Sequence, residues 1–189
     1  MKTTKLQILN FMALCCSLGL VVKKLVNPLA NIITESLHIP GGISTGFSIM
    51  FLVIATEIVR TKQCGTLMGT VQGAIALVLG RIGSMGIFAP IGYMIPGLVI
   101  DGVYRWNRYL KLSRTERMMM ANALAAIAAS LTANLLVFHL RGLVLWLYIC
   151  VSAASGSIYG VLGAAIVKRI SPILNFNHMY EGEIYYEKS

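Results

Sequence analysis

The sequence predicts an all-α integral membrane protein, a bundle of six transmembrane helices with a long capping first outer loop. More than half of the residues are hydrophobic and only 12% are charged, about half the charged share of a typical soluble domain. Six apolar segments have close to the roughly 20 residues that a helix needs to cross a bilayer. Small residues recur within these segments, which is typical of helices that pack closely in lipid.

The six expected spans can be followed in order along a single domain of 189 residues. Lys2 and Lys5 precede the first apolar segment as in a signal peptide, but no small-x-small cleavage site follows, so we expect a retained transmembrane helix. A polar tail at about 171–189 is expected to be peripheral. The spans are predicted at about 6–22, 42–59, 64–79, 85–103, 118–138 and 143–167.

The first connection, 23–41, reads KKLVNPLANIITESLHIPG. It is too polar, and too interrupted by Pro28 and Pro40, for a clean span, yet too apolar for an ordinary solvated loop. A re-entrant or surface-lying segment that caps the bundle fits this composition best. We expect Gly41 and Gly42 to form a hinge at the start of the second span.

The distribution of Lys and Arg predicts the orientation of the bundle. With the N-terminus inside, twelve of these residues lie on the cytoplasmic side and four lie outside, so both termini are expected in the cytoplasm. The segment 104–117, YRWNRYLKLSRTER, dominates this count. It is interpreted either as a topology-setting loop or as an amphipathic helix that docks a partner. Because the basic residues lie beside apolar spans, the net charge of +9 does not indicate a nucleic-acid partner.

We expect no catalytic residue and no cofactor. The sequence contains no HExxH, Walker or Asp-rich pattern. The three histidines lie on separate segments without metal-ligand spacing, and no metal site is expected. The four cysteines contain no CxxC pair and are expected to be small apolar core residues.

Polar residues within the apolar spans mark candidate functional positions, because polar groups are costly in lipid. Glu57 and Asp101 fall near the cytoplasmic ends of their spans, where each is expected to pair with a neighbour such as Arg60 or Arg105. Gln72 lies near the middle of the third span, and Asn134 lies toward the outer end of the fifth. For these two residues, hydrogen bonding between helices and ligand binding both stay open.

Aromatic residues gather toward the predicted outer half of the bundle. As membrane anchors they would face lipid; turned inward beside Asn134 and His139, they would stack on a flat heterocycle. Glu35 and His38 on the first connection would close such a pocket. The candidate substrate-binding residues are therefore Glu35, His38, Gln72, Tyr93, Asn134, His139, Trp146 and Tyr148.

Small residues also follow one another at helical spacing. Ala13 and Ser17 do so in the first span, and further stripes run along the fifth (Ala121, Ala125, Ala129) and the sixth (Gly156, Gly160, Ala164). These stripes either pack within the bundle or face another membrane subunit.

Four stretches together resemble the substrate-binding S components of energy-coupling factor (ECF) vitamin transporters. They are IPGGISTGF at the start of the second span, VRTKQCGTLMG after it, GAIALVLG, and APIGYMIPGLVIDGVYR in the fourth span. The likeness covers about residues 6–167. It is closest to the hydroxymethylpyrimidine/thiamine type of S component.

The resemblance implies a six-helix subunit of a bacterial or archaeal cytoplasmic membrane, without ATPase activity of its own. It implies a vitamin-like small molecule held near the outer face under the first loop, and partners consisting of a transmembrane coupling protein and two cytosolic ATPases. In that family, alanines four apart on the first helix contact the coupling protein. Ala13 and Ser17 occupy the matching positions, with the serine as a departure from the pattern.

The sequence thus favours a substrate-capture subunit for ATP-driven vitamin uptake. One alternative is a structural or assembly membrane protein that has no ligand pocket. Another is a self-sufficient secondary transporter, which would need a carboxylate near the membrane midplane, whereas Glu57 and Asp101 are predicted close to the inner face.

Overall fold

The computed structural model describes residues 2–37, 43–78 and 88–174 of the chain. All regular structure within these residues is helical, which confirms the predicted all-α class. A π-helical turn, η2 (Asn134–Phe138), continues the fifth helix. The helices are α1 (Lys2–Leu37), α2 (Ile43–Val59), α3 (Cys64–Val78), α4 (Ala89–Leu110), α5 (Arg114–Ala133) and α6 (Leu143–Leu174).

Three of these helices are long and apolar enough to cross a membrane. The stretches are Leu6–Val26, Arg114–Phe138 and Leu143–Pro172, while α2 and α3 contain shorter apolar stretches. The chain therefore has the composition and helix lengths of a membrane protein.

The first helix differs from the prediction. A single helix of 36 residues replaces the expected span and capping loop, so the predicted break after Val22 is wrong. Pro28 is the one proline in this helix, and no glycine lies between it and Leu37. One proline removes one backbone hydrogen bond, a loss that membrane helices tolerate when neighbouring groups satisfy the freed carbonyl. His38, Gly41 and Gly42 lie outside the described residues.

The basic segment 104–117 is divided between two helices. Its first seven residues extend α4 as far as Leu110, where Lys111 adopts a left-handed conformation and donates its N–H to the carbonyl of Asn107. Ser113 and Glu116 then form a capping box that starts α5, with the side chain of each residue accepting a hydrogen bond from the backbone N–H of the other. The predicted loop is therefore only a short turn between two helices.

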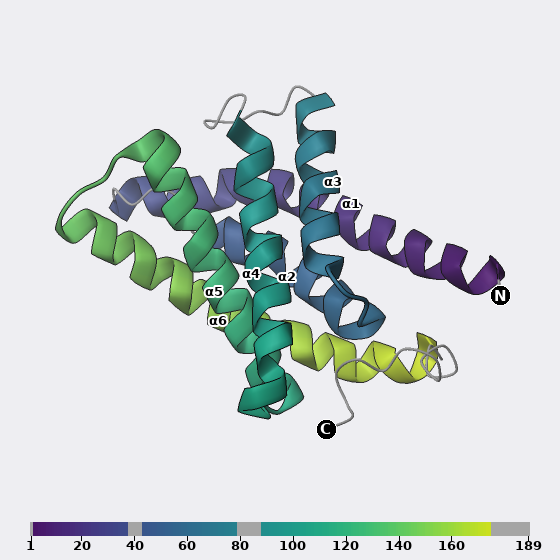
Figure 1. Cartoon of the computed structure of the whole chain (residues 1–189). Helices are drawn as coiled ribbons and strands as arrows, with labels where there is room; N and C mark the ends of the chain where they lie inside the picture. The colour runs from purple at the N-terminus through teal and green to yellow at the C-terminus, as the bar shows by residue number, and fades with distance from the viewer. Residues whose placement is uncertain (1, 38–42, 79–87, 175–189) are drawn as a thin grey trace.

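The second helix lies at the centre of the fold, because α2 contacts each of the other five helices. Its last eight residues, 52–59, are all buried. In Figure 1, α3, α4 and α5 run beside one another, and α1 and α6 cross them at large angles. The core is centred on α2, and both α1 and α6 pack directly against it.

Close backbone approaches hold the bundle together. A Cβ atom at Gly160 of α6 would lie 2.5 Å from the Cα of Met119 in α5, and one at Gly97 of α4 would collide with the carbonyl oxygen of Gly65 in α3. The alanine stripe of α5 is buried as well. The stripes of α5 and α6 therefore pack within the bundle, which is one of the two roles predicted for them.

Candidate functional site

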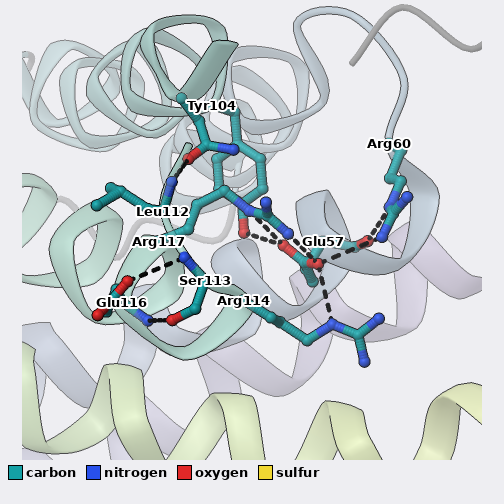
Figure 2. A network of polar contacts seen from close by, with 9 residues as sticks. Glu57, Arg60, Tyr104, Leu112, Ser113, Arg114, Glu116 and Arg117 are labelled. Atoms are coloured by element: carbon teal, nitrogen blue, oxygen red, sulfur yellow. Dashed lines mark hydrogen bonds and ion pairs between the residues drawn. The ribbon is translucent and has the colours of Figure 1, made fainter. Parts of the chain in front are cut away.

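A buried ionic cluster joins the ends of α2 and α4 to the start of α5 (Figure 2). The Glu57 side chain is only 1% exposed. The Nη2 atom of Arg117 lies 2.6 Å from the Oε1 atom of Glu57, and the Nε atom of Arg117 donates to Oε2 of Glu57 at 3.1 Å. The Tyr104 hydroxyl also donates to Oε2, at 2.9 Å. This bidentate geometry is the strongest arrangement that a guanidinium can make with a carboxylate.

Two further arginines approach the same carboxylate at longer range. The Nε of Arg114 lies 3.5 Å from Oε1 of Glu57, and the Nη2 of Arg60 lies 3.7 Å from it. Their side chains are 43% and 36% exposed, against 16% for Arg117. The expected pair of Glu57 with Arg60 is therefore present, but Arg117 is the principal partner. We refer to Glu57, Arg60, Tyr104, Arg114 and Arg117 as the Glu57 cluster.

The turn before α5 positions two of these arginines. Ser113 Oγ accepts from the Glu116 N–H at 3.4 Å, and Glu116 Oε2 accepts from the Ser113 N–H at 2.9 Å. Arg114 and Arg117 follow in the first turn of α5, one helical turn apart, and therefore reach the same carboxylate. The sequence signal for this arrangement is the S-x-x-E pattern at 113–116, which lies within the basic segment 104–117.

Asp101 has a different role from the expected ion pair. Its Oδ1 atom accepts from the Gly65 N–H at 2.9 Å, and its Oδ2 atom accepts from the N–H and the hydroxyl of Thr66 at 2.7 and 2.6 Å. These groups belong to the first turn of α3, where backbone N–H groups have no intrahelical partner. A carboxylate of α4 therefore caps the N-terminus of α3, where it also interacts favourably with the helix dipole.

Gln72 and Tyr93 both face α1. Gln72 is buried, and its Nε2 atom donates to the carbonyl oxygen of Cys16 at 3.1 Å. The ammonium of Lys23 lies 4.5 Å from the ring centroid of Tyr93, in a cation–π contact. For Gln72, the structure thus contains the interhelical hydrogen bond that was one of its two expected roles.

Four other candidates lie where η2 turns into α6. Asn134 closes this turn, because its Oδ1 atom accepts from the Leu140 N–H at 2.7 Å. His139 is exposed and ends η2 in a left-handed conformation. Trp146 is 68% exposed, whereas Tyr148 is 3% exposed. Tyr148 packs edge to face against Phe138, with ring centroids 6.3 Å apart.

The candidate substrate residues therefore form two groups. Gln72 and Tyr93 are held against α1, and the other four lie at the turn between η2 and α6 and in the first turns of α6. No hydrogen bond or ring contact found among the described residues joins the two groups. His38 and the side chain of Glu35 lie outside the described part of the structure.

A buried amide in the core was not foreseen. Asn122 of α5 is fully buried, and its Nδ2 atom donates to the carbonyl oxygens of Gly46 at 3.2 Å and Gly156 at 2.7 Å. It thereby joins α2, α5 and α6. Its Oδ1 atom has no hydrogen-bond partner among the described residues. The sequence signal was an amide within the alanine-rich run MMMANALAAIAAS.

One face of α1 is directed away from the bundle. Cys15, Cys16 and Gly19 are buried, whereas Ala13 and Ser17 are exposed. The Ser17 hydroxyl donates to the carbonyl oxygen of Ala13 at 2.8 Å. The small residues predicted to contact a partner therefore lie on an accessible helix face.

No group of three or more His, Cys, Asp or Glu side chains within the described residues is placed to hold a metal ion. No protein-family model, curated protein or solved structure matches the chain. Functional inference therefore depends on the residues themselves and their contacts.

Proposed function

We propose that the chain is the substrate-capture S subunit of an ECF-type importer, binding a thiamine- or hydroxymethylpyrimidine-like heterocycle. Support comes from the four sequence stretches that resemble this family and from helices with the length and composition of membrane spans. In this proposal all six helices lie in the bacterial or archaeal cytoplasmic membrane, with both termini in the cytoplasm. The observation that carries it is the exposed small-residue face of α1.

This face suits contact with another membrane subunit. Ala13 and Ser17 are small, so a partner helix can approach the backbone of α1 closely. Because the Ser17 hydroxyl is already bonded to Ala13, it needs no polar partner and can be covered by an apolar surface. The occupant in the proposal is the transmembrane coupling protein, which would link this subunit to two cytosolic ATPases.

The ligand would be held at the end of the bundle where η2 meets α6. Tyr148 and Phe138 supply an aromatic pair there, Asn134 and His139 lie at the adjoining turn, and the exposed Trp146 is accessible to a ligand from outside. Aromatic faces bind flat heterocycles, while a few polar groups fix their orientation. ATP hydrolysis in the partner subunits would drive release by favouring a state of lower ligand affinity.

Equilibrium binding to the purified full-length protein tests the ligand assignment. The probes are thiamine and hydroxymethylpyrimidine. Joint substitution of Trp146, Tyr148 and His139 by Ala should weaken binding by more than roughly tenfold, because stacking and hydrogen bonds are lost together. Trp106→Ala is the matched control. Trp106 is 64% exposed and lies near the C-terminal end of α4, beside the start of α5, whereas the proposed pocket lies beyond the end of α5. Unchanged affinity of a folded triple variant would contradict the proposed pocket.

Co-purification tests the partner face. Ala13→Leu with Ser17→Leu should abolish retention of the co-expressed coupling protein and ATPases while leaving ligand affinity unchanged. Leu18→Met, at an exposed position about 100° around the helix from Ser17, is the control that should retain them. Full retention of the partners by the double variant would contradict the role given to α1.

The alternative of a structural or assembly protein is favoured by two observations. Trp146 is directed outward, and the helices approach backbone to backbone at Gly97 and Gly160, so the parts of the interior that these contacts occupy are filled. A scaffold would keep its partners and bind neither heterocycle. The two experiments above therefore distinguish it from the capture subunit.

A further inference from the structure

The Glu57 cluster carries more positive than negative charge. Three guanidinium groups surround one carboxylate, which leaves a surplus of two positive charges. Arg114 and Arg117 also lie in the first turn of α5, where the helix dipole adds further positive potential. Surplus charge of one sign is costly at the end of a bundle with apolar surroundings, so the cluster favours an additional anion.

Two further carboxylates, of Asp101 and Glu116, lie near the cluster and cap helix ends. Both oxygens of Asp101 accept hydrogen bonds from the first turn of α3. Glu116 accepts from the Ser113 N–H in the capping box. Lys62, Arg105 and Lys111 belong to the same helix ends and are exposed. The basic residues at this end of the bundle (Arg60, Lys62, Arg105, Lys111, Arg114 and Arg117) outnumber its carboxylates (Glu57, Asp101 and Glu116), so a surplus of positive charge is left.

Two of the three arginines are accessible from outside. Arg114 approaches Glu57 with its Nε atom, so its two terminal nitrogens point away from the carboxylate (Figure 2). Arg60, directly after the end of α2, approaches Glu57 from a different side than Arg114 does (Figure 2). Both side chains are more than one third exposed, unlike that of Arg117. A guanidinium has five N–H donors in a planar fork, which matches the oxygens of a phosphate.

We propose that Arg60 and Arg114 bind the phosphate of an anionic membrane phospholipid at this end of the bundle. The cluster includes the start of α5, whose stretch Arg114–Phe138 is long and apolar enough to cross a membrane, so it would lie at the depth of the lipid headgroups. Basic sites between membrane helices bind anionic headgroups in this way. Helix α6 packs against the start of α5 at Gly160, and its exposed Ile158 and Leu162 supply apolar surface for acyl chains.

The inference goes beyond vitamin capture and requires only that the bundle lies in a bilayer. A phospholipid phosphate would neutralise part of the surplus charge without displacing Arg117 from Glu57. It would also tether the α4–α5 turn and the end of α2 to one leaflet of the membrane. The lipid would therefore stabilise the arrangement of α2, α4 and α5 that the Glu57 cluster maintains.

Native mass spectrometry of the full-length protein in detergent micelles tests the proposal. The probes are phosphatidylglycerol and phosphatidylcholine with the same acyl chains, titrated separately. The wild type should bind phosphatidylglycerol roughly 25-fold more tightly, since each of the two arginines near the headgroup contributes about fivefold. Arg114→Gln should weaken phosphatidylglycerol binding roughly fivefold, and the Arg60→Gln, Arg114→Gln double variant roughly 25-fold.

Two further variants and a competitor separate the outcomes. Arg114→Lys keeps the charge and should keep the preference for the anionic lipid. Arg141→Gln, at an exposed arginine between η2 and α6, should bind like the wild type. Equal binding of the two lipids by the wild type, or an equal loss in Arg141→Gln, would overturn the proposal. Complete displacement of the lipid by millimolar inorganic phosphate would overturn the lipid assignment, because the site would then bind a free anion.

Discussion

Replacing Arg117 by Met should destabilise the fold more than any other change in the Glu57 cluster. Arg117 makes the two shortest charged contacts of the Glu57 carboxylate, at 2.6 and 3.1 Å. Its loss leaves a carboxylate that is 1% exposed, with the Tyr104 hydroxyl and two more distant arginines as partners. Removing one member of a buried ion pair costs about 3–5 kcal/mol. Because Arg60 and Arg114 can move closer, we expect about 3 kcal/mol, the lower end of this range.

Two comparisons isolate the buried charge as the cause. Arg114→Gln removes an exposed, longer contact and should cost about 0.2–1 kcal/mol. Combining Arg117→Met with Glu57→Gln removes both charges, so the double variant should be more stable than Arg117→Met alone. The free energy of unfolding would be measured in dodecylmaltoside micelles by titration with sodium dodecyl sulfate, followed by far-ultraviolet circular dichroism. A cost for Arg117→Met no larger than that for Arg114→Gln would refute the reasoning.

Three further substitutions test the helix contacts with the same unfolding measurement. Gly97→Ala should cost about 1–3 kcal/mol by overpacking, because the added Cβ collides with the Gly65 carbonyl. Gly102→Ala is the control and should be neutral or stabilising, because its Cβ meets nothing within 4 Å. Equal effects of the two substitutions would contradict the backbone contact at Gly97. Asp101→Ala should cost about 0.5–2 kcal/mol through loss of the α3 cap, and a change below the error of measurement would show that water replaces it. Gln72→Met should cost about 0.6–2 kcal/mol through loss of the bond to Cys16, and a gain in stability would rule that bond out as a contributor.

The helix positions followed from the sequence where an apolar run is bounded by helix-breaking residues. The starts of α2, α3 and α6 lie within one residue of the prediction, because each follows a turn or a glycine. The end of the first helix was missed because Pro28 was taken as a boundary, whereas the helix continues through it as far as Leu37. A proline is a boundary only when the surrounding chain does not satisfy the freed carbonyl.

The contacts of the polar residues were harder to predict. Pairing of Glu57 with Arg60 is visible from a spacing of three residues, but Arg117 is 60 residues away and is brought close only by the packing of α2 against α5. Asp101 reaches the start of α3 because α3 and α4 pack side by side. The outward position of Trp146 and the burial of Tyr148 depend on the rotation of α6. A helix that is apolar on all sides does not reveal this rotation in its sequence.

Mass spectrometry of small molecules that co-purify with the protein tests vitamin capture most directly. The full-length protein would be purified in mild detergent from cells supplied with thiamine and hydroxymethylpyrimidine, and its bound molecules would be released by denaturation. A capture subunit should carry a pyrimidine or thiazole compound in near-stoichiometric amount, and the joint substitution of Trp146, Tyr148 and His139 should lose it. Preparations of folded wild-type protein that repeatedly carry no such compound would contradict capture and favour the scaffold.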